Sequence, residues 1–428
     1  MLFRSYFFGW AFGDRMAVAP TVCLPDDHDV YQGNIWGEGG KIVKAGSMNA
    51  ISGYRQPVEM VEVVHQTNCG QLPEPFDPTP AKNGITVYYT HLRYGRTSFA
   101  ILGDRQFKSG PERVDTSGGD PKSRADHVQS ADVDIASLDK PGLTLLGQRQ
   151  LDFLNAWVDD WKGVDLKVVL SETVFANAAT HHGAKNNYLY ADLDSGGWPQ
   201  SARAKALLNI RRAFPLHVNG DQHLTMLSEY GIEQPHDGPW SFCTPAVSVG
   251  YQRWWRPEEM GQQPAPMSRP PHGLPNTGDF RDGFGNLIHV YAVGNPEGSA
   301  HPNRYTQAAV KASGLGFVEL DPAARSYTCH AIRFAADPAN PAAPANPFPG
   351  FPHTIPQAEN GGLPFTPLPE VTTAPGPAGT GQVVRVFKTT GGARELVSAR
   401  RLPPGNHTLH AWQANANPAD YEVTVTDD

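Results

Sequence analysis

Short apolar runs that end in polar clusters recur along the first half of the chain. They lie at residues 21–24, 98–102, 166–170 and 216–218, and they show little alternation of apolar and polar positions. Such runs are typical of buried strands that open into loops at their carboxyl ends. Between the later runs, apolar residues return at helical spacing, over 151–161 and again over 207–214. The pattern predicts an α/β fold, in which ligands bind beyond the carboxyl ends of the strands.

The pattern changes after about residue 335, where X-Pro pairs recur without hydrophobic periodicity. Such a composition is typical of an extended, semi-rigid linker. Beyond it, 383–387 and 422–426 are predicted strands, and a turn at 403–406 precedes 408–412. We therefore expect a main domain over 1–334, a proline-rich linker over 335–380 and a small β unit over 381–428 that packs on its neighbour.

Composition narrows the function classes. The 428 residues have a net charge of -8, so the chain offers no overall positive field to a nucleic acid. The 4 cysteines lie far apart, which excludes a zinc ribbon and a dense disulfide scaffold. No apolar stretch is long enough to span a membrane. The start imitates a signal peptide, but an amphipathic helix leading into a strand is the preferred interpretation.

Four consecutive ionisable residues, Asp26-Asp27-His28-Asp29, follow the first apolar run. Carboxylates held this close raise one another's pKa, and a metal ion removes that conflict. Asp is a hard oxygen ligand suited to calcium, magnesium, manganese or ferric iron, and the adjacent His28 is then free to act as a general acid. An acidic surface turn is the alternative that these four residues leave open.

A second cluster, Gly220-Asp221-Gln222-His223, follows the run at 216–218. In an extended loop Asp221 and His223 both reach one site, the Asp on one metal and the His on another. Two such clusters at strand ends of one sheet arise by chance far less often than one. Together they favour a metal centre.

The residues after the run at 98–102 allow two roles. Arg105 and Lys108 suit a phosphate clamp, but we favour a buried pair of Asp104 with Arg105 that braces the sheet.

Three further polar groups are expected to be structural. The pair His181-His182 is predicted to lie in a solvated loop, because adjacent loop residues point apart. Asp192-Leu193-Asp194 lacks the terminal Glu of an EF-hand loop and is expected to cap the following helix. In Arg253-Trp254-Trp255-Arg256 the tryptophans are expected to cover the edge of the core while the arginines reach to solvent.

Taken together, these stretches resemble the PhoD-like (alkaline phosphatase D) branch of the calcineurin-like metallophosphoesterases. The matching stretches appear in family order over roughly residues 1–330, and they are 24–30 with Asn34, 99–108, 146–150, 197–199 with Arg203, and 219–223. The resemblance implies a β-sandwich flanked by helices, with two or more metal ions at the strand ends. It also implies an enzyme that hydrolyses phosphomonoesters or phosphodiesters.

The resemblance implies residue roles as well. Asp27, Asp221 and His223 fall on metal ligands, and His28 falls on the catalytic acid that protonates the leaving group. The ions would be calcium, iron, manganese or zinc. The residues expected close to the substrate are Asp26, Asn34 and Arg105. A small phosphate ester is the expected partner, and the family suggests an extracytoplasmic protein, whether periplasmic, secreted or at the cell surface.

Two earlier metal-binding motifs of the family are not found ahead of Asp26. The nearest segment to the family's Gly-Asp-x-x-Tyr is Gly13-Asp14-Arg15-Met16, which lacks the Tyr. We therefore expect a domain truncated at its N-terminus, with weak or no phosphatase activity in this chain alone. The alternative is a catalytically impaired homologue or fragment that acts as a binding or surface scaffold. A mononuclear zinc hydrolase built on the histidines 181, 182 and 223 has weaker support, because they lack a short ligand spacing.

Overall fold

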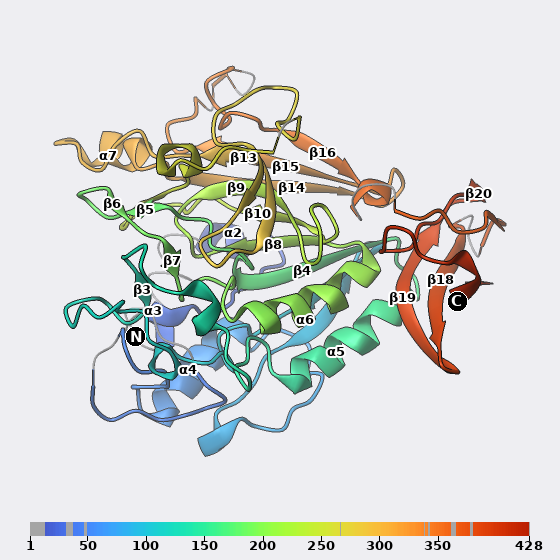
Figure 1. Cartoon of the computed structure of the whole chain (residues 1–428), viewed down its shortest axis with the longest axis horizontal. Helices are drawn as coiled ribbons and strands as arrows, with labels where there is room; N and C mark the ends of the chain where they lie inside the picture. The colour runs from blue at the N-terminus through green and yellow to red at the C-terminus, as the bar shows by residue number, and fades with distance from the viewer. Residues whose placement is uncertain are drawn as a thin grey trace.

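The computed structural model (Figure 1) describes residues 13–30, 37–46, 49–265, 267–337, 339–340, 343–360, 365–376 and 380–427. Asn34 lies outside these ranges. The helices are α2 (Gly13–Met16), α3 (Asp27–Val30), α4 (Val58–Cys69), α5 (Gln148–Asp159), α6 (Gln200–Ile210) and α7 (Arg304–Val310). Within the described ranges, no helix has the length and apolar character needed to cross a membrane.

An eight-stranded mixed sheet forms the centre of the molecule. Its strands, in spatial order, are β1 (Thr90–Tyr94), β2 (Thr97–Ile101), β4 (Leu166–Thr173), β8 (Leu216–Gly220), β10 (Trp240–Cys243), β9 (Thr225–Tyr230), β13 (Leu287–Gly294) and β12 (Gly278–Arg281). Strands β2, β4, β8 and β10 are parallel, and the outer strands pair antiparallel. This mixed α/β architecture confirms the coarse prediction. It also brings the carboxyl ends of β2, β4 and β8 to one edge of the sheet.

Both faces of the sheet are covered (Figure 1). On one face, α5 and α6 pack through Leu154 and Ile210 into the cluster that contains Val169 of β4. On the other face, Val168 of β4 packs with Tyr327 of a small sheet made of β14 (Gly314–Asp321), β15 (Ser326–Arg333) and β16 (His353–Pro356). A strand covered on both sides has a nearly continuous apolar sequence, which explains why 166–170 was recognisable as buried.

The expected strand at 21–24 is not formed. Residues 21–26 are irregular, and the short helix α3 follows them. The run is bounded by Pro20 and Pro25, which cannot donate to a β ladder. The prediction of a strand there was wrong, whereas the runs at 98–102, 166–170 and 216–218 do form β2, β4 and β8.

The proline-rich stretch after residue 335 is not extended throughout. Its segment β16 pairs antiparallel with β15, from Ser326↔Pro356 to Cys329↔His353. Phe348 and Phe351 are buried between that small sheet and the large one. Aromatic side chains set between the prolines therefore fold this stretch onto the main body. The division into three domains stays a prediction.

The last part of the chain forms two further small sheets, at the right of Figure 1. One joins β18 (Gln382–Thr390), β19 (Ala393–Leu402) and β21 (Tyr421–Thr426), and the other joins β17 (Val371–Thr373) and β20 (Gly405–His407). The side chain of Arg401 donates to the carbonyls of Trp161 (2.9 Å) and Val164 (3.0 Å), just beyond α5. Val383 and Ala399 belong to the same core cluster as α5 and α6. The C-terminal strands thus help to close the main core.

Candidate metal centre at the sheet edge

Loops from three parallel strands meet at the sheet edge. Asp104, just after β2, ties two of them together, because its carboxylate accepts the backbone N–H of Glu172 (3.0 Å) and of Thr173 (3.1 Å) at the end of β4. From behind, Gln150 of α5 accepts the N–H of Gly103 (2.9 Å) and donates to its carbonyl (3.0 Å). The backbone that presents Arg105 is therefore fixed by two buried polar side chains.

Arg105 lies at the middle of the edge, with only 1% of its surface exposed. Its Nη1 lies 2.7 Å from Oδ1 of Asp194, and its Nη2 lies 2.7 Å from Oδ2 of Asp221. Its Nε lies 3.0 Å from Oδ1 of Asp26 and 3.5 Å from Oε2 of Glu172. One buried guanidinium is thus shared by four carboxylates.

Asp26 and Asp27 begin the turn that becomes α3. The Oδ1 of Asp26 accepts the N–H of Asp27 (2.8 Å), and the Oδ2 of Asp29 accepts the N–H of Asp26 (3.0 Å). Asp27 is buried, and its Oδ2 has no hydrogen-bond partner among the described residues. Burial, together with the charge of Asp26, raises the pKa of Asp27 well above its usual value. Ligand atoms of Asp26, Asp27 and Asp221 lie within 4.8 Å of one another.

The loop after β8 turns sharply at Asp221 and His223, whose φ angles of 63° and 53° are left-handed. Burial raises the pKa of Asp221 to about 8, although the nearby Arg105 opposes the shift. Burial lowers the pKa of His223 to about 4, so its ring is neutral at pH 7. Its Nδ1 donates to the carbonyl of Tyr251, which leaves the lone pair of Nε2 as a free acceptor.

His28 lies at the solvent side of this group. Its side chain is 75% exposed, and its Nε2 lies 3.7 Å from Oδ2 of Asp27. The structure therefore brings together Asp26, Asp27, Asp221 and Arg105, with His28 at their rim. Because Asp26, Asp27 and Asp221 offer only oxygen ligands, this group suits a hard cation such as calcium, magnesium, manganese or ferric iron.

Sequence reasoning missed a second layer of charge beneath this group. Asp194 binds Arg105, and the Oδ2 of Asp192 lies 2.9 Å from Nη2 of Arg253. The Nζ of Lys108 donates to the carbonyls of residues 193 (2.6 Å), 194 (3.0 Å) and 195 (2.7 Å), which holds the intervening loop rigidly. The sequence shows Asp192 and Asp194 on either side of Leu193. Only the fold shows that their partners are the buried arginines Arg253 and Arg105.

Three sequence interpretations were therefore wrong. Asp192 and Asp194 do not cap α6; instead the carboxylate of Asp139 accepts the N–H of Ser201 in its first turn. Arg253 is 3% exposed and ion-paired rather than solvated. The pair at 181–182 forms the buried strand β5 (His181–His182), which β11 (Arg253–Trp254) and β6 (Asn187–Tyr188) flank. For His181, His182 and Arg253, pairing across a short sheet buries polar side chains that a local pattern assigns to the surface, whereas Asp194 is buried by its ion pair with Arg105.

The predictions for the two tryptophans and for the pair of Asp104 with Arg105 had different outcomes. Trp254 and Trp255 are buried at 2% and 1% exposure, as expected. Asp104 and Arg105 are both buried, but the ion pairs of Arg105 are made with four other acids.

Comparisons with known proteins do not establish a family for this chain. No protein-family model and no curated protein matches the chain. A solved structure described as "Structure of PhoD" aligns with 67% of this chain and 46% of its own chain, at 16% sequence identity and a TM-score of 0.38. This chain thus spans less than half the length of that protein. Its similarity is too low to support an activity, so the resemblance to PhoD-like enzymes rests on the sequence motifs alone.

Proposed function

We propose that the chain is a metal-dependent phosphoester hydrolase of the PhoD-like type, acting on a phosphomonoester or phosphodiester. The observation behind the proposal is the convergence of Asp26, Asp27 and Asp221, with ligand atoms within 4.8 Å of one another. The Oδ2 of buried Asp27 has no hydrogen-bond donor among the described residues, which is the condition expected of a carboxylate that receives a cation. A hard ion held there would supply Lewis acidity toward a phosphoryl group and toward the attacking water.

The protein's own residues then divide the remaining work. Arg105 fixes the carboxylates of Asp26 and Asp221 through contacts of 3.0 and 2.7 Å, so the ligand set is preorganised. His28, exposed and 3.7 Å from Asp27, is placed to give a proton to a leaving alkoxide at the mouth of the site. His223, two residues beyond Asp221, is neutral at pH 7 and keeps a nitrogen lone pair, but it lies outside the group formed by Asp26, Asp27 and Asp221.

The test is turnover of p-nitrophenyl phosphate and bis-p-nitrophenyl phosphate with calcium, manganese or iron added to metal-stripped protein. We expect weak, metal-dependent turnover that Asp27→Asn abolishes and that His28→Ala lowers by about 10²- to 10⁴-fold. His301→Ala, at another exposed histidine, is the matched control and leaves the rate unchanged. Turnover that persists in Asp27→Asn, or none with any metal, contradicts the proposal.

A second candidate function follows from Arg105 itself. Its guanidinium already occupies the middle of the acidic group, so it is a resident cation for the same carboxylates that a metal would need. In that case the chain is a non-catalytic scaffold. Calorimetric titration with calcium and manganese separates the two candidates. A scaffold binds neither ion in the wild type but gains binding in Arg105→Ala, whereas a hydrolase loses affinity in that variant.

A further inference from the structure

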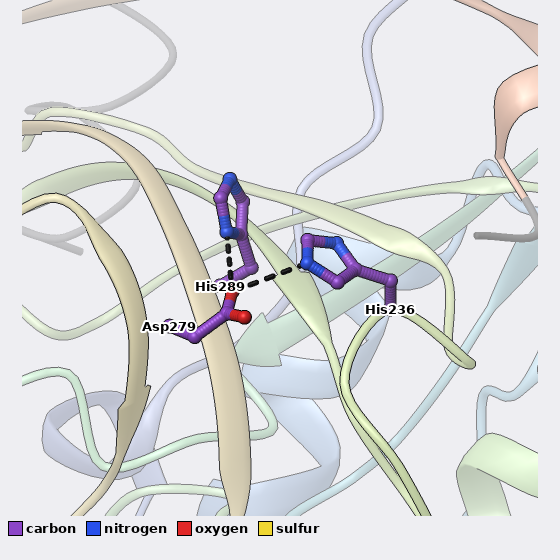
Figure 2. Close-up of side chains that lie close together, drawn as sticks. All are labelled: His236, Asp279 and His289. Carbon is purple, nitrogen blue, oxygen red and sulfur yellow. Dashed lines mark hydrogen bonds and ion pairs between the residues drawn. The ribbon is translucent and has the colours of Figure 1, made fainter. Parts of the chain in front are cut away.

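A second group of metal-type ligands lies on the same sheet, far along the strands from the acidic edge. It contains His236, Asp279 and His289 (Figure 2). Asp279 pairs directly with His289 across β12 and β13, and His289 pairs with Glu229 across β13 and β9. Directly opposite residues of antiparallel strands share a face, so these three side chains form one row. His236 comes from the turn between β9 and β10 and lies over that row.

One carboxylate oxygen joins the two imidazoles. The Oδ1 of Asp279 lies 2.7 Å from Nδ1 of His289 and 3.1 Å from Nε2 of His236. The two rings lie 4.5 Å apart between centroids. Ligands of a tetrahedral zinc ion at about 2.0–2.2 Å from the metal lie roughly 3.3 Å from one another. Small outward movements of the three side chains would therefore admit an ion between them.

A buried carboxylate, Glu229, lies behind His236 and independently supports a cation at this group. It is 2% exposed, and its Oε2 lies 2.5 Å from Nδ1 of His236. Its Oε1 has no hydrogen-bond partner among the described residues. A carboxylate acceptor at Nδ1 places the ring proton there and directs the lone pair of Nε2 toward Asp279. Two electron-rich atoms then face each other, and this contact needs either a further proton or a cation. A carboxylate behind a ligand histidine is the usual arrangement in zinc sites.

We propose that His236, Asp279 and His289 bind a divalent transition metal of the zinc class, with Glu229 orienting His236. Two imidazole nitrogens and one carboxylate oxygen are a borderline ligand set that suits zinc, cobalt or nickel, and differs from the all-oxygen group at the acidic edge. His236 and Asp279 keep side-chain exposures of 17% and 20%, so solvent can complete the coordination. The site does not depend on the proposed phosphoesterase activity.

The test uses the full chain, stripped with chelator and titrated with cobalt(II), whose visible absorption is strong at tetrahedral sites. We expect this absorption in the wild type and in Asp27→Asn, and its loss in His289→Gln and in Asp279→Asn. Glu229→Gln should weaken binding by about 10- to 100-fold. His272→Gln is the matched control, because His272 lies outside the ligand group: its Nε2 donates to the carbonyl of Tyr291 (2.9 Å) and its Nδ1 accepts the N–H of Leu274 (3.2 Å).

Folding of each variant is checked by circular dichroism. Asp279→Asn preserves side-chain shape, so it keeps the test valid if His289→Gln misfolds. Absorption that survives in both variants would overturn the proposal. So would a wild type that binds no cobalt, since a doubly protonated His236 would then fully account for the contacts.

Discussion

At the scale of single residues, the unusual feature is how much charge is buried around Arg105. Arg105 is enclosed by four carboxylates, and Arg253 and Lys108 lie behind it. A buried ion pair adds little net stability when formed, because both charges lose water. Removing one partner is costly, because the other charge stays buried alone.

Arg105→Met should therefore lower the free energy of unfolding by about 3–5 kcal/mol. Urea unfolding measures the change. Arg93→Met is the control, because Arg93 and its partner Asp160 are both exposed, and a loss of only about 0–1 kcal/mol is expected there. Equal losses of unfolding free energy in the two variants would show that the four carboxylates around Arg105 do not make its removal more costly than that of an exposed arginine.

His65 on α4 should make the protein sensitive to acid. Burial lowers the pKa of its imidazole from 6.5 to about 4, and its Nδ1 lies 2.9 Å from Oγ1 of Thr86. The folded state therefore favours the neutral ring, so its contribution is fully present above pH 6.5 and is lost as the pH falls toward 4. At 1.36 kcal/mol per pKa unit, the loss is roughly 3 kcal/mol.

Unfolding of wild type and His65→Gln between pH 7 and pH 4 tests this. The variant should lose less stability over that interval, since it has no ring to protonate. Parallel pH profiles for the two proteins would contradict the prediction.

At the scale of elements, the N-terminus of α6 is capped by a residue far from it in sequence. Asp139 accepts the backbone N–H of Ser201 at 3.1 and 3.2 Å, whereas Pro199, the residue before the helix, makes no side-chain cap. Asp139→Ala should cost about 0.5–2 kcal/mol, the usual effect of losing a cap. Thermal unfolding measures it, with Asp132→Ala as an exposed control. An unchanged melting temperature in Asp139→Ala would rule out this capping.

The elements that sequence could predict are those with strong local signals. β4 was recognisable from its unbroken apolar run, and α5 from its helical spacing at Leu151, Leu154 and Val158. The strand β19 was missed because its sequence, Ala-Arg-Glu-Leu-Val-Ser-Ala-Arg-Arg-Leu, has no regular alternation of apolar and polar residues. Only its pairing with β18 makes it a strand.

The candidate site shows the same division. Asp27 and Asp221 were identified because each follows an apolar run and lies in a compact polar motif with a nearby histidine. Asp194 and Arg253 were assigned to other roles, since their burial results from contacts more than fifty residues away in the chain. Long-range pairing of charges leaves no local pattern.

At the scale of the whole molecule, the C-terminal strands and the central sheet should unfold together. Arg401 is 3% exposed and donates to the carbonyls of Trp161 and Val164. Each hydrogen bond to a charged group is worth about 1.5–3 kcal/mol, so Arg401→Ala should destabilise the protein by at least about 3 kcal/mol.

Because the core is shared, that loss should shift a single transition rather than create a second one. Tryptophan fluorescence and far-UV circular dichroism, followed in the same urea series, should give coincident curves in both proteins. Arg394→Ala, on the same strand but exposed, is the control. Two separated transitions in Arg401→Ala would show that the C-terminal strands unfold independently.

The shared core also bears on how the protein is made. Val383 and Ala399 belong to a cluster that also contains Val87 and Tyr89, so the side chains that complete it are synthesised long after those that begin it. Until β18 and β19 are synthesised, the apolar surface of α5 and α6 that they cover stays exposed. Exposed apolar surface favours association with other chains. A nascent chain arrested before β18 therefore lacks Val383 and Ala399 and is a form that needs a chaperone.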